Sequence, residues 1–420
     1  MTVDRTALTR RFLEVRGRTE ALAAPLSPED QQLQSMPTCS PTKWHRAHTT
    51  WFFETFVLAP RGVAPVDPRW GFLFNSYYEA VGPRHARPRR GLLSRPSCDE
   101  IATYRRTVDG RVVELLAGAD DRELAALAPL IALGLAHEEQ HQELLLTDAL
   151  HALAQNPLRP AYRGPAPPPA ADAAAPLTFT PFDGGLVELG CDAPVDAAAF
   201  VFDNETPRHK VWLEPFALAD RLITAGEVIA FAADGGYRTS SLWLSDGWDL
   251  IRAGELDAPG HARVDGDDLI VFGLDGERRA GAAEPAAFLS FYEADAIARW
   301  LGARLPSEAE WEVAARAAGA PAGNFLDGDA LRPLPAAGGS VAQLWGDAWE
   351  WTRSSYEPYP GFAAAAGALG EYNGKFMVNQ RVLRGGSCFT PPGHVRATYR
   401  NFWHPDTRFQ VTGVRLARPA

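Results

Sequence analysis

The sequence lacks any long uninterrupted run of apolar residues. A helix that crosses a membrane needs roughly 18 to 20 such residues in a row, and no stretch of this 420-residue chain provides them. The first residues, MTVDRTALTRRFLEV, include Asp4 and Glu14 and contain no apolar run of signal-peptide length. These absences argue against a membrane partner and predict a soluble, cytoplasmic protein.

The sequence also contains few cysteines and has no excess of positive charge. The four cysteines, Cys39, Cys98, Cys191 and Cys388, are far apart and form no CxxC pair. This spacing argues against a disulfide framework and against a thiolate zinc site. With 41 basic and 52 acidic residues, the formal net charge is −11. An acidic balance of this size argues against a general nucleic-acid partner.

The length suggests two or three domains, and the first of them, residues 1–156, is expected to be a four-helix bundle. In SPTKWHRAHTTWFFETFVL, Ser40 is the expected N-cap and Pro41 the first helical residue. In SCDEIATYRRTVDGRVVELL, Ser97 and Glu100 have capping-box spacing. The other two helices are TALTRRFLEVRGRTEAL and a long pattern over residues 121–155, interrupted only by a proline and a glycine.

Composition changes sharply after the expected bundle. Residues 157–177 are rich in proline and alanine and predict a semi-rigid linker. Residues 178–420 contain short, turn-punctuated segments typical of strands, such as FDGGLVELG, HKVWLEPFALAD, RVLRGGSCF and TGVRLAR. Only SFYEADAIARWLGA reads as a clear helix. The whole chain is therefore predicted to be an α+β protein.

The stretch LAHEEQHQELLL contains the pattern HExxH, which in a helix is the signature of zinc metalloproteases. His137 and His141 are one helical turn apart, so both imidazoles can face one metal, and Glu138 has the position of a protease's general base. A third ligand is missing downstream, however, because Leu144 and Thr147 replace the glycine and histidine of the metzincin pattern. The protease interpretation is therefore disfavoured.

A second histidine pair lies upstream, in WHRAHTTWFFE, where His45 and His48 are three residues apart. Two packed helices could bring His137, His141 and one of these two together as a three-histidine site. Three neutral imidazoles leave the full charge of a divalent metal and up to three open positions, which suits Fe(II). The same ligands would suit zinc hydrolysis, so ligand type alone does not choose the metal.

Several longer motifs resemble one family. PTKWHRAHTTWFFETFVL, FNSYYEAVGPRHARPRRGLLSRPS and AHEEQHQELL are similar to the ergothioneine-biosynthesis sulfoxide synthases. These are nonheme iron enzymes in which a DinB-like bundle precedes a domain similar to the formylglycine-generating enzymes, with a C-type-lectin-like fold. The second half carries the matching motifs NETPRHKVWLEPFALADRLITAGEV, SFYEADAIARWLGARLPSEAEWEVAAR, GDAWEWTRSSYEPYPGF and RVLRGGSCFTPPGHVRATYRNFWHP, in the family's order.

The resemblance implies an Fe(II) site made by His48, His137 and His141, with His45 behind the ligands or in packing. It implies an O2-dependent reaction that couples a cysteine-type thiol to the imidazole C2 of hercynine and oxidises the sulfur to a sulfoxide. A hydroxyl close to the metal suits the role of proton donor, and the resemblance points to Tyr77 or Tyr78 without choosing between them.

The resemblance also implies substrate-binding residues. Arg87 and Arg90 match positions that hold the thiol substrate's carboxylate, and a guanidinium can grip a carboxylate bidentately. Gln140 matches the position that reaches the substrate imidazole, and Asn401 the position that contacts the hercynine carboxylate. Because a trimethylammonium group has no N–H donor, aromatic faces should recognise it, and the next two residues, Phe402 and Trp403, are candidates.

One departure from the family pattern bears on the thiol donor. Family members that use γ-glutamylcysteine tend to read NWDHP where this chain reads NFWHP, so Trp403 replaces an aspartate that could receive the glutamyl ammonium. We therefore expect small-molecule substrates, with free L-cysteine as thiol donor, hercynylcysteine sulfoxide as product and γ-glutamylcysteine as the alternative donor.

Three rival functions remain at the level of sequence. A 5-histidylcysteine sulfoxide synthase shares the helical motifs but usually carries a further methyltransferase domain. A formylglycine-generating oxidase would need a close cysteine pair, and only Cys191 and Cys388 are present in that half. The third rival is a lectin-like binding module on an inert helical scaffold, which would carry no stoichiometric iron.

Overall fold

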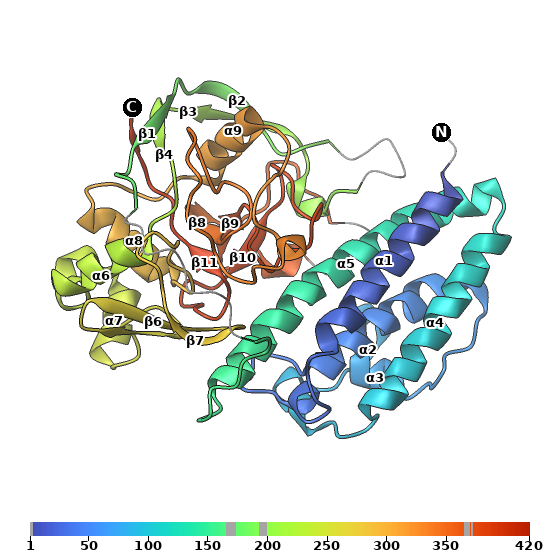
Figure 1. Cartoon of the computed structure of the whole chain (residues 1–420). Coiled ribbons are helices and arrows are strands. Elements are labelled where there is room, and N and C mark those ends of the chain that lie inside the picture. Colours follow the sequence, from blue (N-terminus) through green and yellow to red (C-terminus); the bar gives the residue numbers. More distant parts are fainter. Residues whose placement is uncertain (1–2, 165–173, 193–199, 365–369, 371–372) are drawn as a thin grey trace. The chain divides into compact units, whose positions relative to one another are not determined.

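The computed structural model describes residues 3–164, 174–192, 200–364, 370 and 373–420 (Figure 1). The chain divides into two compact units. The first contains Met1–Asn156, Ala193–Asp203 and Ala363–Gly374, and the second contains Pro157–Asp192, Asn204–Phe362 and Lys375–Ala420. The middle of the expected linker, residues 165–173, lies outside the described residues.

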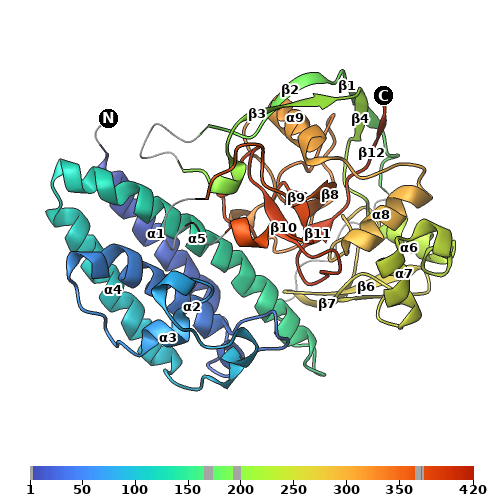
Figure 2. The same cartoon turned by 180° about the vertical axis from the view of Figure 1, so that it is seen from behind.

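The first unit is built on four long helices, as the sequence predicts. Their bounds are Arg5–Ala23 for α1, Thr42–Phe52 for α2, Cys98–Gly118 for α4 and Asp121–Ala154 for α5, with a short α3 at Trp70–Phe74. Figures 1 and 2 show α2 beside both α4 and α5, and α1 beside α5. The predicted capping box is confirmed, since the Ser97 and Glu100 side chains bond each other's backbone N–H groups.

The start of α2 differs from the prediction by one residue. Pro41, with extended backbone angles, occupies the N-cap position and Thr42 is the first helical residue, so the prediction that Ser40 caps this helix is wrong. The backbone N–H of Ser40 instead donates to Oδ2 of Asp148 on α5, at 2.8 Å. The helix continues after Phe52 as a π-helical segment over Phe53–Leu58. No side-chain hydrogen bond caps the start of α2.

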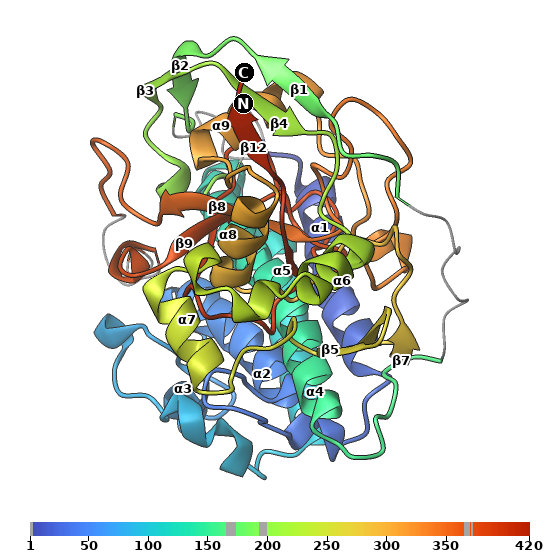
Figure 3. The same cartoon turned by 90° about the vertical axis from the view of Figure 1, so that its left-hand side faces the viewer.

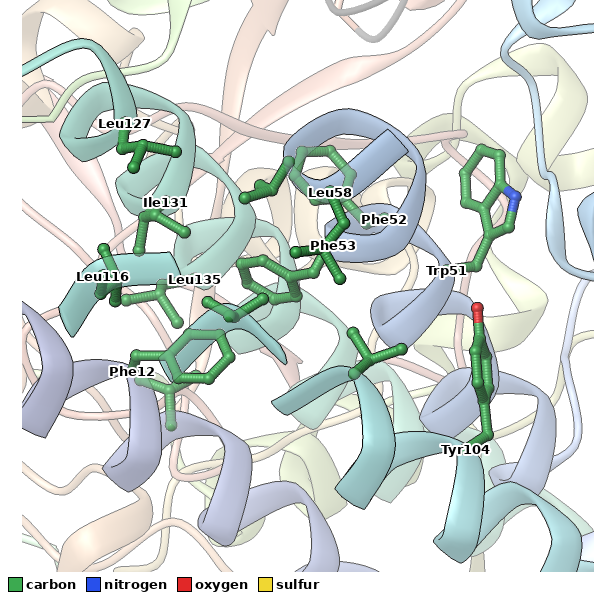
Figure 4. Packing of buried hydrophobic residues seen from close by; sticks show 14 of the residues in the cluster. Phe12, Trp51, Phe52, Phe53, Leu58, Tyr104, Leu116, Leu127, Ile131 and Leu135 are labelled. Atoms are coloured by element: carbon green, nitrogen blue, oxygen red, sulfur yellow. The ribbon is translucent and has the colours of Figure 1, made fainter. Parts of the chain in front are cut away.

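The glycine that interrupts the long pattern of α5 has a packing role. A Cβ atom at Gly134 would lie 2.6 Å from Cε1 of the Phe53 ring, closer than real Cβ atoms come to any neighbour. Phe53 in turn meets Phe12 of α1 edge to face at 5.1 Å, and Figure 4 shows these two rings in the buried cluster with Leu135. The glycine therefore lets the π-helical segment approach α5 closely.

The described residues of the second unit form four α-helices and four small sheets. The sheet orders are β10-β9-β8-β11, β1-β4-β12, β2-β3 and β5-β6-β7, and Figure 3 shows β4 with β1 and β12 beside it. The expected helix is α8, Phe291–Trp300. The strand bounds are Phe179–Phe182, Gly185–Leu189, His209–Leu213, Phe216–Ala219, Ala262–Asp265, Asp268–Gly273, Gly276–Arg279, Trp349–Ser355, Arg381–Arg384, Asn401–Trp403, Thr412–Gly413 and Ala417–Pro419, for β1 to β12.

Three further helices were not clear from the sequence. They are α6 at Ala225–Ala233, α7 at Ser245–Arg252 and α9 at Glu308–Ala318. The helices α6 and α9 begin with capping boxes, but all three are only two to three turns long, so their apolar periodicity repeats too few times to stand out. The one clear helix is confirmed, these three add to it, and the expectation of an α+β chain is confirmed.

Two expected absences can be compared with the structure. All four cysteines are free in the structure, as their spacing predicts. Among the described residues, no helix has both the length and the apolar character that a membrane crossing requires.

Candidate metal centre

Two helices of the first unit bring three histidines together. His48 lies on α2, and His137 and His141 lie one turn apart on α5. One ring nitrogen from each lies within 4.8 Å of the others, and all three side chains are buried. The Nε2 atoms of His48 and His137 are 3.2 Å apart. The structure therefore assembles the three residues that the sequence resemblance implies as ligands.

Burial keeps these imidazoles neutral. It is the largest cause that lowers the pKa of His137, to about 4, and the pKa values of His48 and His141 well below their usual range. Neighbouring imidazoles in the same cluster lower the last two further. A neutral imidazole offers a lone pair, whereas a protonated one cannot bind a metal, so the cluster is in the protonation state that a metal requires.

The hydrogen bonds of two of the rings also fit a metal. Nδ1 of His48 lies 2.6 Å from the carbonyl oxygen of Phe74 and must donate to it, so the lone pair of His48 is on Nε2. Nε2 of His137 faces that lone pair. Among the described residues, Nδ1 of His137 is buried without a hydrogen-bond partner. The Nε2 atoms of His48 and His137, 3.2 Å apart, are therefore the nitrogens that these two rings could offer to one metal.

The other histidine of α2 does not join the cluster. His45 is buried, with Nδ1 at 2.8 Å from Nδ1 of His141 and Nε2 at 3.0 Å from Oδ2 of Asp148. Both of its nitrogens are therefore engaged by protein atoms. This contact leaves Nε2 as the nitrogen of His141 that is available to a metal.

The glutamate of the HExxH pattern has a different environment from a protease base. Glu138 is fully buried and accepts hydrogen bonds from Arg16 at 2.6 Å, Thr19 at 2.6 Å and Arg105 at 2.8 Å. Burial raises its pKa, but the two arginines and the threonine outweigh it and leave the pKa at about 2. A carboxylate held by two guanidinium groups is a poor proton acceptor, which agrees with the disfavoured protease interpretation.

Aromatic rings fix the orientation of His48. Its imidazole stacks on Trp44 at a centroid distance of 4.5 Å and an interplanar angle of 13°, and on Trp51 at 5.6 Å and 17°. The indole N–H of Trp44 donates to the carbonyl oxygen of Leu73 at 3.0 Å, which fixes that ring in turn. Rings of this size have few rotamers, so His48 is held in place before any ligand binds.

Arg90 is a buried cation next to this cluster. Its guanidinium carbon lies 3.4 Å above the ring of Trp44, the indole that stacks on His48. Its nitrogens donate to the hydroxyls of Ser40 at 3.0 Å and Ser76 at 3.2 Å, while Nε has no partner. Among the described residues, no carboxylate pairs with it. Burial and then the charge of Arg87 lower its pKa to about 9.

A buried cation without a counterion is unfavourable unless an anion completes the site. Arg90 therefore has the character of a carboxylate-binding residue. Arg87 is exposed, and its guanidinium donates to the carbonyl oxygen of Thr38. Arg84, another arginine of this loop, is paired with Glu79 at the surface. Of the loop's four arginines, only Arg90 is buried.

The two candidate tyrosines have different environments. Tyr78 is buried in the apolar cluster, with its ring 5.7 Å from Trp51 and 5.2 Å from Phe56. Tyr77 is only partly buried, and its phenol lies close enough to Arg90 to raise the pKa of that guanidinium. Gln140 is half-buried on α5, between His137 and His141 in sequence. Tyr77 is therefore the more accessible phenol.

The remaining candidates belong to the second unit. Asn401, Phe402 and Trp403 form β10, which pairs antiparallel with β9. Side chains alternate along a strand, so Asn401 and Trp403 share one face and Phe402 points to the other. There Phe402 stacks on Tyr356 at 4.0 Å and 11°. One face of the Phe402 ring is thus already covered by protein.

Two residues of the centre were missed at the level of sequence. Asp148 follows His141 by seven positions, which places both on one face of a helix, so an acidic residue two turns later was an available signal. Trp44 precedes His48 by four positions on the same face of α2. It was noted only as an apolar residue, although its spacing from His48 already placed the two rings on one face of α2; the contact with Arg90 comes from a distant segment.

Both halves of the chain match known protein families. Residues 11–145 match the DinB superfamily, and residues 178–339 and 332–420 match the sulfatase-modifying factor enzyme 1-like domain. All three histidines of the cluster thus lie in the DinB match. The order of the two matches is the one that the sequence motifs predict.

Full-length relatives are also similar to this chain. It is 34% identical to the hercynine oxygenase of Mycobacterium tuberculosis over 408 residues, which cover 91% of each chain. It is 32% identical to the hercynine oxygenase of Mycolicibacterium thermoresistibile over 453 residues, which cover 98% of this chain and 95% of the relative. It is 28% identical to the formylglycine-generating enzyme of Streptomyces coelicolor over 264 residues, or 52% of this chain and 82% of that one.

Proposed function

Because the chain belongs to the hercynine oxygenase family of oxidoreductases, the sulfoxide synthases of ergothioneine biosynthesis, we propose that it joins L-cysteine to hercynine with O2. The product is hercynylcysteine sulfoxide, with the sulfur bonded to the imidazole C2. The observation that carries the proposal is the buried cluster of three neutral histidines, found in a chain that matches these relatives over nearly its whole length.

The proposed cofactor is Fe(II), held by His48, His137 and His141. Three neutral ligands leave its positive charge uncompensated and leave positions open for substrate atoms. When bound, the iron supplies activation of O2 and favours the thiolate form of the cysteine substrate. The protein's contribution is to hold three lone pairs in a buried, aromatic-walled space.

The overall reaction balances without another reductant. Forming the C–S bond removes one hydrogen from the imidazole carbon and one from the thiol, which releases two electrons. Oxidising the sulfur to the sulfoxide releases two more. O2 accepts all four electrons, so that one oxygen atom enters the sulfoxide and the other leaves as water with the two hydrogens.

Arg90 is proposed to bind the carboxylate of cysteine, with Arg87 supporting it from the exposed side. The buried guanidinium lacks a carboxylate partner among the described residues, and a substrate carboxylate would restore the missing negative charge. Arg90 lies close to the histidine cluster, because its guanidinium contacts the ring of Trp44 and the same ring stacks on His48. The thiol of the same substrate can then reach the metal.

Tyr77 is the proposed proton donor, because it is more accessible than Tyr78 and lies in the field of Arg90. Gln140 is proposed to contact the imidazole of hercynine. Asn401 is proposed to hold its carboxylate. Trp403, on the same face of β10 as Asn401, is the stronger candidate to face its trimethylammonium group, and Phe402, whose ring stacks on Tyr356, is the weaker one. The roles of Gln140 and Asn401 rest on the family resemblance of their positions, and those of Phe402 and Trp403 on the affinity of aromatic faces for a cation.

Cysteine is preferred over γ-glutamylcysteine as the thiol donor for one reason of charge. The glutamyl part would bring an extra ammonium group, and Trp403 stands where relatives of that type tend to have an aspartate. An indole can contact an ammonium only through its π face, which is worth less than an ion pair with a carboxylate at a desolvated site.

The decisive experiment is anaerobic reconstitution with Fe(II), followed by O2, hercynine and either thiol donor, with mass analysis of the products. We expect one iron per chain and a product that carries one cysteine and one oxygen atom. Changing His48, His137 or His141 to Ala should abolish iron retention. His151→Asn, a histidine of the same helix that contacts Ser35 instead, is the matched control and should retain iron.

Three outcomes would contradict the proposal. A wild-type protein without stoichiometric iron or Fe(II)-dependent O2 uptake would refute the metal centre and favour a binding module. Faster coupling with γ-glutamylcysteine would refute the choice of donor. Preference for unmethylated histidine over hercynine would favour a 5-histidylcysteine sulfoxide synthase.

A further inference from the structure

A chain of three buried side chains runs behind one of the proposed ligands. Oδ2 of Asp148 lies 3.0 Å from Nε2 of His45, and Nδ1 of His45 lies 2.8 Å from Nδ1 of His141. Asp148 comes from α5 and His45 from α2, and both are less than a tenth exposed. We call these three side chains the Asp148–His45–His141 relay.

The positions of the protons in this relay follow from its geometry. Two ring nitrogens 2.8 Å apart need one proton between them, so one donates and the other accepts. An ionised carboxylate only accepts, so Nε2 of His45 carries a proton and donates it to Asp148. When this is the only proton on the ring, Nδ1 of His45 is bare and accepts from Nδ1 of His141. The lone pair of His141 is thereby placed on Nε2.

The opposite arrangement would prevent metal binding. If His45 carried a proton on Nδ1, it would donate to His141, whose own proton would then lie on Nε2. An imidazole protonated at Nε2 has no lone pair there for a metal. The carboxylate of Asp148 selects between the two arrangements from the far end of the relay, two hydrogen bonds away from the ligand atom.

We propose that Asp148 and His45 are positioning residues that fix His141 as an Nε2 ligand and strengthen its hold on the metal. This inference rests on the metal centre of the proposed function and adds two residues to which the family resemblance assigns no ligand role. Carboxylate–histidine–metal arrangements are a common way to set the tautomer of a ligand. Here a second imidazole extends that arrangement by one residue.

The three proposed ligands differ in this support. His48 donates Nδ1 to a backbone carbonyl, and His137 has no partner for Nδ1 among the described residues. Within the described parts of the chain, only His141 of these three is backed by a carboxylate, through the relay. The anchor itself is fixed, because Asp148 also accepts the backbone N–H of Ser40 at 2.8 Å. This contact also ties Asp148 to the residue that precedes the N-cap of α2.

The test compares metal affinity in variants that change the direction or the presence of one hydrogen bond. In Asp148→Asn, the amide can donate to Nε2 of His45 and reverse the relay. In His45→Leu, the acceptor for His141 is lost, whereas His45→Gln can still offer a carbonyl oxygen to it. We expect the dissociation constant for Fe(II) or Co(II) to rise about 10- to 100-fold in the first two variants and markedly less in His45→Gln.

Two measurements separate this role from a merely structural one. The visible ligand-field spectrum of the Co(II) protein should shift in Asp148→Asn at saturating metal, and the unfolding temperature of the metal-free protein should change little. His151→Asn, next to the relay on α5, is the control and should keep both the affinity and the spectrum.

Stoichiometric metal in the wild type, with unchanged affinity and spectrum in Asp148→Asn and His45→Leu, would overturn the relay and leave the metal centre standing. Equal losses in His45→Leu and His45→Gln would also overturn it, because an acceptor would then not matter. A wild type that binds no metal refutes the proposed function as well, so the two failures are distinguishable.

Discussion

Replacing Glu138 by Gln tests whether this residue is structural, as its contacts indicate, or the general base of a metalloprotease. The substitution keeps the size of the side chain and removes its charge. Its carboxylate accepts from Arg16, Arg105 and Thr19 inside the bundle, at full burial. We expect Glu138→Gln to destabilise the fold and to leave metal binding intact.

The size of the effect follows from the structure in two ways. A pKa of about 2, against 4.5 for an unperturbed glutamate, corresponds to about 3 kcal/mol of folding free energy. Breaking one partner of a buried ion pair typically costs about 3–5 kcal/mol. Because Arg16 keeps Asp109 at 2.7 Å and Arg105 keeps Glu20 at 2.8 Å, we expect the lower end, about 3 kcal/mol.

The assay is thermal and urea unfolding of the metal-free protein, followed by metal analysis of the reconstituted variant. A loss of about 3 kcal/mol should lower the unfolding temperature by roughly 6–12 °C for a unit of this size. The control is Glu14→Gln, which removes an exposed pair with Arg10 at 3.8 Å and should cost at most about 0.5 kcal/mol.

The same carboxylate gives a pH dependence with a definite sign. The folded state holds the pKa of Glu138 below its unfolded value, so its contribution to stability is fully present above about pH 4.5. It is lost as the pH falls toward 2. Glu138→Gln should lack this part of the acid transition. An unchanged unfolding temperature, or loss of metal without loss of stability, would refute the structural role.

The remaining predictions concern the substrate side and the packing of the centre. Arg90→Met should raise the KM for cysteine about 10- to 100-fold, as expected for losing charge-assisted hydrogen bonds, while iron stoichiometry measured by metal analysis stays at wild-type level. Tyr77→Phe should reduce C–S coupling more than O2 uptake and divert the reaction toward plain thiol oxidation, whereas Tyr78→Phe should mainly lower stability. Product analysis combined with an oxygen electrode distinguishes the two effects. Normal coupling in both variants would place the proton donor elsewhere. Gly134→Ala should destabilise the bundle by about 1–3 kcal/mol, because its Cβ would meet Phe53; thermal unfolding measures this, and a stable variant would contradict the close approach.

Much of the bundle was predictable because helix signals are local. The capping box at Ser97 and the one-turn spacing of His137 and His141 depend only on residues a few positions apart. The same holds for the composition change after residue 156. Motifs spread over the whole chain then identified the family, which the comparisons confirm. The short helices α6 and α7 were missed, because two turns give too little periodicity.

The sequence by itself determined that two histidine-bearing helices exist and that their histidines can face a metal. Only the tertiary structure decided which histidine of α2 joins the cluster, since His48 and His137 are 89 positions apart and meet through packing. It also turned Glu138 toward arginines from α1 and α4, and His45 toward Asp148. Spacing along one helix fixes which residues share a face, but the partner of that face comes from distant segments whose position depends on the whole core.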